Sequence, residues 1–276
     1  MTTRVSFGPF RAENVNLSGS DFVTGIPSPS AALGFVGAIA RKLGVLGWDH
    51  RAILIIHDLE EGTGRQRGEQ AIKAGRLIPV EIAETVTGRG LFTIIAEIPG
   101  HHSITSLTAA FIRMRFSGGS IFAPSGLSLP QVVRPVKGLD ISAILAQLPR
   151  GMALAPPQDR NDARTVSFGE ETSLEDIAFR SYSAKGMKMG GYLVPCPVGY
   201  RVLEETMTET PPRRCRNTEI PFALVDSAVG LAEYVSIRNR KAFEDTHAAF
   251  DACGWAWSCT GNLKMFSPFH LGAASA

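Results

Sequence analysis

Positively charged side chains that could hold phosphate gather in two short stretches of this sequence. Residues 62–76 are glycine-rich and carry four cations against one acid, and those cations are Arg65, Arg67, Lys73 and Arg76. A second group, Arg213, Arg214 and Arg216, directly follows two prolines. Guanidinium groups contact phosphate and stack on bases, so both stretches are candidates for binding a single-stranded nucleic acid. Most charged loops, however, are only solvated.

Two further stretches could bring backbone amides close to a phosphate. One is the expected start of a helix, where unpaired N–H groups and a partial positive charge can attract an anion, although most capped helices bind nothing. The other is a Gly-Gly-Ser turn with two arginines just upstream, which could let backbone approach a ligand or could be a plain turn. The candidate RNA-contacting residues of these stretches are Ser28, Pro29, Ser30, Arg113, Arg115, Gly118, Gly119 and Ser120.

Three histidines are the residues best suited to act as a general base in RNA cleavage: His57, His101 and His102. The plainer interpretation is structural, since His57 ends an apolar run and the pair lies in a turn before a helix. No hydrolase, zinc-protease or dinucleotide-binding motif occurs in the sequence. The four cysteines lie far apart, without C-x-x-C spacing. We therefore expect no catalytic residue, no metal and no cofactor.

Composition indicates a globular protein. The chain has 276 residues, 44% of them apolar, and a formal net charge of only +2. Arginine outnumbers lysine, and the planar guanidinium group of arginine can form two hydrogen bonds to one phosphate. No apolar run approaches the roughly 18 residues of a membrane span, and the start of the sequence lacks the pattern of an export signal. These features, with the scattered cysteines, predict a cytoplasmic protein without membrane contact.

The elements that would position these residues follow a β-α-β-β-α-β order. Strands are predicted at 4–11 and 51–57, a hairpin at 78–86 and 91–98, and a further strand from 121. Helices are predicted at 29–43, capped by Ser28, and at 103–116, capped by Ser103. This order predicts an α+β, ferredoxin-like fold of the kind found in RNA-recognition domains.

A proline-rich and then acidic stretch suggests a boundary near residue 155. Residues 1–154 would form the ferredoxin-like domain, with a basic insertion at about 60–77. Residues 155–276 would supply a linker, strands at 191–195 and 200–203, and a helix at 221–234 that pack on the first domain or complete it.

Four motifs, in order, resemble the second Csy subunit, the Cas-five-type protein of type I-F CRISPR complexes. The longest is GIPSPSAALGFV at residues 25–36, followed by AIARKLG at 38–44. The others are GGSI at 118–121, GYLVPCPVGY at 191–200, and RNTEIP at 216–221 leading to GLAEY at 230–234. This chain is shorter than the usual family pattern between residues 58 and 78, which suggests a compact variant.

The resemblance implies a member of the repeat-associated (RAMP) superfamily with a ferredoxin-like fold and an inserted thumb. It implies a non-catalytic subunit of the surveillance complex that binds the 5′ handle of the crRNA and docks with the large subunit and the terminal backbone subunit. Target DNA would pair with the guide rather than with this protein. Two alternatives stay open: a repeat-RNA endoribonuclease using His57 or His102, and a subunit that mainly binds other proteins.

Overall fold

The computed structural model describes residues 2–18, 23–67, 70–73, 76–79, 82–136, 138, 140–156, 192–202, 225–260 and 265–267. The helices are α1 (Pro29–Lys42), α2 (Ile104–Phe111), η1 (Leu129–Val132), α3 (Ser142–Gln147) and α6 (Thr246–Cys253). The strands are β1 (Thr2–Asn16), β2 (Arg51–Arg67), β3 (Gln70–Lys73), β4 (Arg76–Pro79), β5 (Ile82–Pro99), β6 (Arg115–Phe116), β7 (Gly119–Phe122), β8 (Val133–Pro135), β9 (Met152–Ala155), β10 (Tyr192–Val202), β11 (Val225–Ser236), β12 (Trp255–Ala256), β13 (Ser258–Thr260) and β14 (Met265–Ser267).

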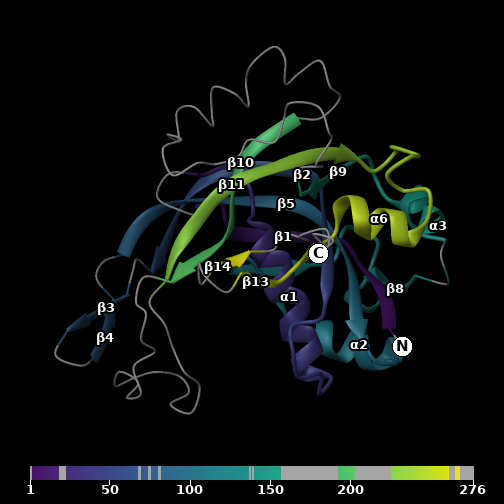
Figure 1. Ribbon diagram of the computed structural model, residues 1–276, viewed down its shortest axis with the longest axis horizontal. Coiled ribbons are helices and arrows are strands. Elements are labelled where there is room, and N and C mark those ends of the chain that lie inside the picture. The colour runs from purple at the N-terminus through teal and green to yellow at the C-terminus, as the bar shows by residue number, and fades with distance from the viewer. Residues whose placement is uncertain are drawn as a thin grey trace.

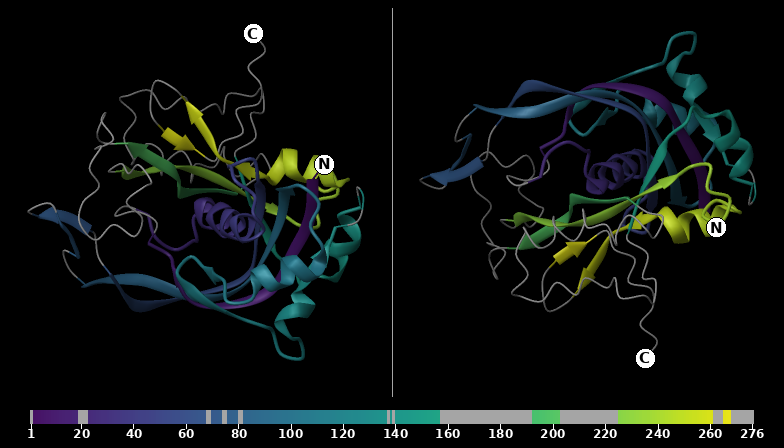
Figure 2. Two further views of the ribbon diagram at one scale, coloured as in Figure 1. Left: turned by 90° about the horizontal axis from the view of Figure 1, so that it is seen from below. Right: turned by 90° about the horizontal axis from the view of Figure 1, so that it is seen from above.

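One large antiparallel sheet dominates the described part of the chain. Its strand order is β13-β14-β10-β11-β9-β2-β5-β1-β7-β6, with β12 added beside β2 and β8 beside β1. The sheet curls into a half-barrel that wraps around α1, which is seen nearly end-on inside the curve in Figure 2. The hairpin of β3 and β4 lies beyond the far ends of the long strands β2 and β5 (Figure 1).

The expected ferredoxin-like βαββαβ fold is wrong. In such a fold a small sheet would carry both helices on one face. Here the sheet continues through β9, β11 and β10, which come from the second half of the chain, and α1 lies in the hollow of the curled sheet (Figure 2). The sequence pattern of the first 120 residues does not reveal this continuation, because it depends on long-range pairing. Strand β9 pairs with β2, and β11 pairs with the other edge of β9.

Helix α1 forms where the sequence predicts it. The Ser28 side chain accepts a hydrogen bond from the Ser30 amide, and Pro29 occupies the first helical turn, where its missing N–H costs nothing. The face carrying Leu33, Val36 and Ile39 is fully buried. Phe35 of the same helix joins an aromatic cluster with Phe7, Phe10 and Phe116 from the sheet and Phe111 from α2.

A second apolar cluster covers the other face of the sheet. Alternate residues of β2 point to opposite sides: Leu54 belongs to the core around α1, whereas Ile53 and Ile55 belong to the second cluster with α3 and α6. The prediction that residues 51–57 form a strand buried on both faces is thereby confirmed. Arg51 fixes α6 to the sheet through the Phe250 carbonyl at 2.6 Å. Within the described ranges, no helix is long and apolar enough to cross a membrane.

The predicted hairpin at 78–86 and 91–98 is wrong, because β5 runs straight through the glycines that suggested a turn. Gly88 and Gly90 have no room for a side chain: an added Cβ would lie 2.7 Å from the Glu60 carbonyl at the first position and 2.5 Å from the Asp58 carbonyl at the second. Glycine inside a strand often marks such close approach or a bend. These glycines therefore let the long β2–β5 pair curl tightly.

The predicted helix at 221–234 is also wrong from residue 225 onward. This segment is β11, which pairs with β10 on one side and β9 on the other. The two short strands expected at 191–195 and 200–203 are one strand, β10, with a bulge between Pro197 and Gly199. Val198 at that bulge packs so closely on Gly230 that an added Cβ there would lie 2.6 Å from a Val198 methyl group. The domain boundary near residue 155 stays a prediction.

Candidate functional site

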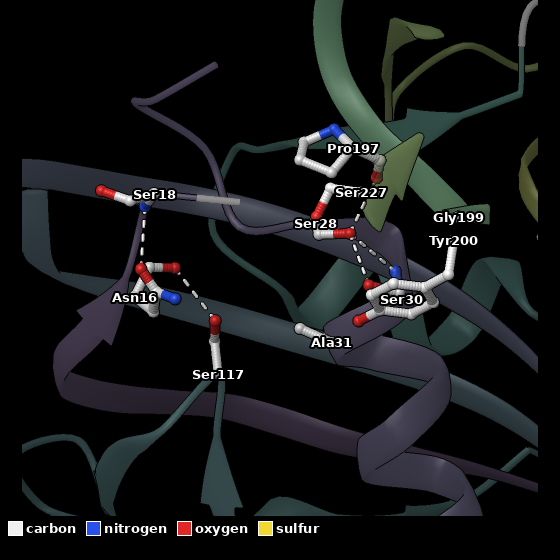
Figure 3. A pocket seen from close by; sticks show the side chains of 10 residues that line it. All are labelled: Asn16, Ser18, Ser28, Ser30, Ala31, Ser117, Pro197, Gly199, Tyr200 and Ser227. Atoms are coloured by element: carbon white, nitrogen blue, oxygen red, sulfur yellow. Dashed lines mark hydrogen bonds between the residues drawn. The ribbon is translucent and has the colours of Figure 1, made fainter. Parts of the chain in front are cut away.

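A polar pocket lies where the start of α1 meets the ends of several strands (Figure 3). It has a volume of about 170 Å³, many times what one water molecule needs. Its lining comes from the end of β1, the start of α1, the turn between β6 and β7, and strands β10 and β11. The lining residues are Asn16, Ser18, Ser28, Ser30, Ala31, Ser117, Pro197, Gly199, Tyr200 and Ser227.

Ser28 ties the start of α1 to β10. Its hydroxyl donates to the Pro197 carbonyl at 2.8 Å and accepts from the Ser30 amide at 3.1 Å. The Ser28 hydroxyl lies 2.6 Å from the Ser30 hydroxyl. Since the single Ser28 hydroxyl proton is used on Pro197, Ser30 is the donor in that contact. The Ser30 oxygen therefore keeps its acceptor capacity, and its amide is already satisfied.

The opposite wall is built on Asn16 and Ser117. The backbone amide of Asn16 donates to the Ser117 carbonyl at 2.8 Å, and the Ser117 hydroxyl donates to the backbone carbonyl of Asn16 at 2.9 Å. Ser117 has φ of +46°, a left-handed conformation that costs energy for a residue with a side chain. The Asn16 side-chain oxygen accepts from the Ser18 amide at 2.8 Å. This reciprocal bonding holds the wall rigid.

Tyr200 forms an aromatic side of the pocket. Its ring lies beside Ser30 (Figure 3) and stacks on Trp257, with centroids 6.3 Å apart and an interplanar angle of 20°. Trp257 in turn meets the exposed Trp48 edge-on at 6.1 Å. The Tyr200 hydroxyl has no hydrogen-bond partner among the described residues. An aromatic row thus leads from the pocket to the surface.

The pocket offers neutral hydrogen-bonding groups and no charged side chain. Within the described residues, the side-chain Nδ2 of Asn16 and the hydroxyl of Tyr200 remain free to donate. The Ser18 hydroxyl accepts from the Val86 amide but keeps its own proton. Such a lining suits a sugar hydroxyl or the polar edge of a base. A bare phosphate would meet an already capped helix, since Ser28 occupies the Ser30 amide and Pro29 has none.

The predicted Gly-Gly-Ser stretch begins one residue after the pocket wall. Gly118 has φ of +80°, and Gly119 lies so close to β1 that a Cβ would be 2.6 Å from the Glu13 carbonyl. These glycines are therefore explained by a tight turn and close strand packing. Arg115 donates to the Gly118 carbonyl at 3.4 Å, and Arg113 is exposed with φ of +69°. The helix predicted to reach residue 116 ends at Phe111 because the chain turns sharply there into β6.

The other predicted RNA-contacting cations do not line this pocket. Arg65 and Arg67 are on β2, Lys73 on β3 and Arg76 on β4, so the basic stretch is built of strands; their side chains are outside the described part of the structure. The group Arg213, Arg214 and Arg216 lies outside the described residues altogether. Whether these cations contact RNA stays a prediction.

The candidate catalytic histidines make structural hydrogen bonds. His57 contacts the Arg150 carbonyl at 3.1 Å through Nδ1 and the Thr93 hydroxyl at 2.8 Å through Nε2, and burial lowers its pKa. His102 Nε2 contacts the Pro99 carbonyl at 2.7 Å. Among the described residues, no group of three or more histidine, cysteine, aspartate or glutamate side chains could hold a metal ion.

Several pocket residues were not singled out from the sequence. Pro197, Gly199 and Tyr200 lie in a motif that resembles the family pattern, but nothing in their spacing indicates a shared pocket with Ser28. Asn16, Ser18 and Ser117 carry no motif at all. Their contribution depends on bonds between residues about 100 positions apart, such as Ser117 to Asn16.

Comparison with known families finds a match in the C-terminal half of the chain. Residues 165–260, which include β10, β11 and α6, match the family model described as CRISPR-associated protein (Cas_Csy2). No curated protein matches the chain. The match falls on two of the motifs found in the sequence, and the pocket residues Pro197, Gly199, Tyr200 and Ser227 lie within it. This match supports a Csy2-type subunit of a type I-F CRISPR complex, in agreement with the motifs found in the sequence.

Proposed function

We propose that this protein is a non-catalytic subunit that holds the 5′ handle of the crRNA, with the pocket at the start of α1 as one of its RNA contacts. The observation that carries the proposal is the convergence of three motifs far apart in the sequence. Ser28 belongs to the first, Ser117 directly precedes the second, and Pro197 belongs to the third; all three residues line one pocket.

The chemistry of the pocket suits part of a nucleotide other than its phosphate. The free Asn16 and Tyr200 donors could bond to the edge of a base or a ribose hydroxyl, and RNA differs from DNA in offering a 2′-hydroxyl. Arg113 and Arg115 lie just before the turn that begins at Ser117, and neither forms an ion pair with an acid in the described part of the chain. In our proposal these two arginines contact the neighbouring phosphates. Arg65, Arg67, Lys73, Arg76, Arg213, Arg214 and Arg216 extend the RNA contact from the basic segments.

A non-catalytic role is supported by how His57 is held. A general base needs a free ring nitrogen within reach of the substrate, whereas both nitrogens of His57 already have partners. Metal-independent cleavage of repeat RNA by the purified protein, lost in His57→Ala or His102→Ala, would instead support the endoribonuclease alternative.

Docking with the large subunit and the terminal backbone subunit is the second part of the proposal. The loop after α1 supports it, because Leu46 is 92% exposed and Trp48 is 64% exposed. Large apolar side chains this exposed commonly mark a surface that another protein covers.

The test is to co-express the chain with the other complex subunits and a CRISPR array, purify it by a tag, and sequence the RNA recovered with it. We expect uniform guides with a fixed 5′ handle. The variant Asn16→Ala with Tyr200→Phe removes two free donors and should lower guide recovery several-fold. Ser103→Ala, which removes a helix cap at α2 away from the pocket, is the matched control and should leave recovery unchanged.

Two outcomes would count against this proposal. If the purified protein carries no RNA in any combination of subunits, it does not bind the guide and the proposal is wrong. Full guide recovery by the Asn16→Ala/Tyr200→Phe variant would exclude the pocket as an RNA contact, and a charge-neutral Arg65/Arg67/Arg76 variant that loads guides normally would exclude those arginines.

A further inference from the structure

A second group of cations lies at the opposite end of β11 from the pocket. It consists of Arg134, Arg150, Arg238, Arg240 and Lys241, and we call it the α3 basic surface. Hydrogen bonds draw these residues together around α3: Arg238 donates to the Leu145 and Leu148 carbonyls at 2.7 and 2.8 Å, and Arg134 donates to the Gln147 side chain at 3.1 Å. The Ile237 amide donates to the Gly151 carbonyl at 3.2 Å, which brings Arg238 beside Arg150.

These cations differ from four arginines of β1, β2 and β5 in having no acidic partner among the described residues. Arg4, Arg11, Arg51 and Arg89, which lie on β1, β2 and β5, all form ion pairs. In the described part of the chain, none of the five residues of the α3 basic surface does so. Asp140 and Asp245, at the starts of α3 and α6, accept hydrogen bonds that cap those helices.

The surface is also rigid. Arg238 is fixed by the carbonyls at the end of α3, and the Asn239 side chain accepts from the amides of Lys241 and Ala242 at 3.1 and 3.3 Å. Arg150, Arg240 and Lys241 are exposed, and their side chains make no hydrogen bond or ion pair among the described residues. Arg240 and Lys241 are carried on this ordered turn, and cationic groups on an ordered backbone lose little backbone entropy when they meet an anion.

The distance to the pocket makes this a separate site. Ser227 lines the pocket and Ser236 ends β11, nine residues further along the same strand. At about 3.3 Å per residue they are roughly 30 Å apart. An extended anion such as a nucleic-acid strand is the ligand that presents regularly spaced negative charges to several cations at once.

We propose that the α3 basic surface binds the phosphodiester backbone of a nucleic acid, independently of the pocket. The contacts come from Arg150, Arg240 and Lys241, while Arg238 and Arg134 hold the surface in shape. The backbone belongs either to the guide RNA beyond its handle or to target DNA, and the assembled complex distinguishes the two.

The test uses the ribonucleoprotein purified after co-expression, with the chain carrying Arg150→Gln, Arg240→Gln and Lys241→Gln. Binding of double-stranded target DNA is measured over a range of salt concentrations, and guide RNA per particle is quantified. The matched control is Arg11→Gln with Arg89→Gln, which removes two exposed but ion-paired arginines. Unchanged melting temperature in both variants shows that folding is intact.

If target DNA is the ligand, we expect normal guide content, about tenfold weaker DNA binding at physiological salt, and a salt slope lower by about 2 to 3. If guide RNA is the ligand, guide content falls instead. Guide content and DNA binding that both match the wild type would overturn the proposal. So would an equal loss in the control variant, or loss of a protein subunit with nucleic-acid binding intact.

Discussion

Ser28 and Pro197, 169 positions apart in sequence, are joined by a hydrogen bond of 2.8 Å from the Ser28 hydroxyl to the Pro197 carbonyl. The same hydroxyl caps α1. One side chain therefore both starts the helix inside the curled sheet and fastens it to β10, and in doing so it closes one end of the pocket.

Replacing Ser28 by alanine should cost more stability than replacing Ser103, although both serines cap helices. Loss of a serine cap costs about 1 kcal/mol. Ser28→Ala also deprives the buried Pro197 carbonyl of a donor, which adds roughly 1 to 2 kcal/mol. Denaturant unfolding of Ser28→Ala and Ser103→Ala measures the difference. Equal losses would mean that the contact with Pro197 adds nothing to stability.

Local signals in the sequence were sufficient to predict α1, its cap and its buried face. Ser28, Pro29 and the spacing of Leu33, Val36 and Ile39 act within a few turns, and the structure places them as predicted. The buried strand at 51–57 was recognised for the same reason, since an apolar run flanked by polar residues is a local feature.

Features that depend on distant residues were not predicted. Gly88 and Gly90 indicate a turn by themselves, but they lie in a strand because Glu60 and Asp58 approach from β2. The segment Val225–Ser236 has helix-like apolar spacing, yet pairing with both β10 and β9 makes it a strand. No pocket is predicted from the sequence: Ser28 and Ser30 are candidates only as the start of a helix, and their place beside Asn16, Ser18 and Ser117 depends on the fold.

Two glycines should respond in opposite ways to replacement by alanine. A Cβ at Gly34, on the exposed side of α1, would meet nothing within 4 Å in the described part of the chain, so Gly34→Ala should stabilise by up to about 1 kcal/mol through helix propensity. A Cβ at Gly88 would lie 2.7 Å from the Glu60 carbonyl, and Gly88→Ala should destabilise by about 1 to 3 kcal/mol. Melting temperatures report both, and destabilisation by Gly34→Ala would contradict the exposed position.

Stability should fall as the pH drops below about 6.5, in part because of the buried His50 and the half-buried His57. Burial lowers the pKa of both His50 and His57 below the ordinary value of 6.5. The unfolded chain therefore binds protons at a pH where the folded chain does not, which favours unfolding. Above pH 6.5 both states are neutral and the effect vanishes.

The check is the melting temperature between pH 7.5 and 5.5, a range that stays above the titration of ordinary carboxylates. The double variant His50→Gln/His57→Gln should show a flatter dependence than the wild type, whatever its absolute stability. A slope as steep as that of the wild type would exclude these histidines as its source.

The loop after α1 should govern how the isolated subunit behaves in solution. Leu46 and Trp48 are exposed by 92% and 64%, and Trp48 extends the aromatic row formed by Trp257 and Tyr200. Replacing both Leu46 and Trp48 by serine should reduce self-association of the isolated protein, measured by light scattering.

The same change should weaken co-purification of partner subunits after RNase treatment, because the apolar surface that they cover is lost. Leu127→Ser, at an apolar position that is only 36% exposed, is the control. Full partner recovery by the double variant would place the docking surface elsewhere on the molecule.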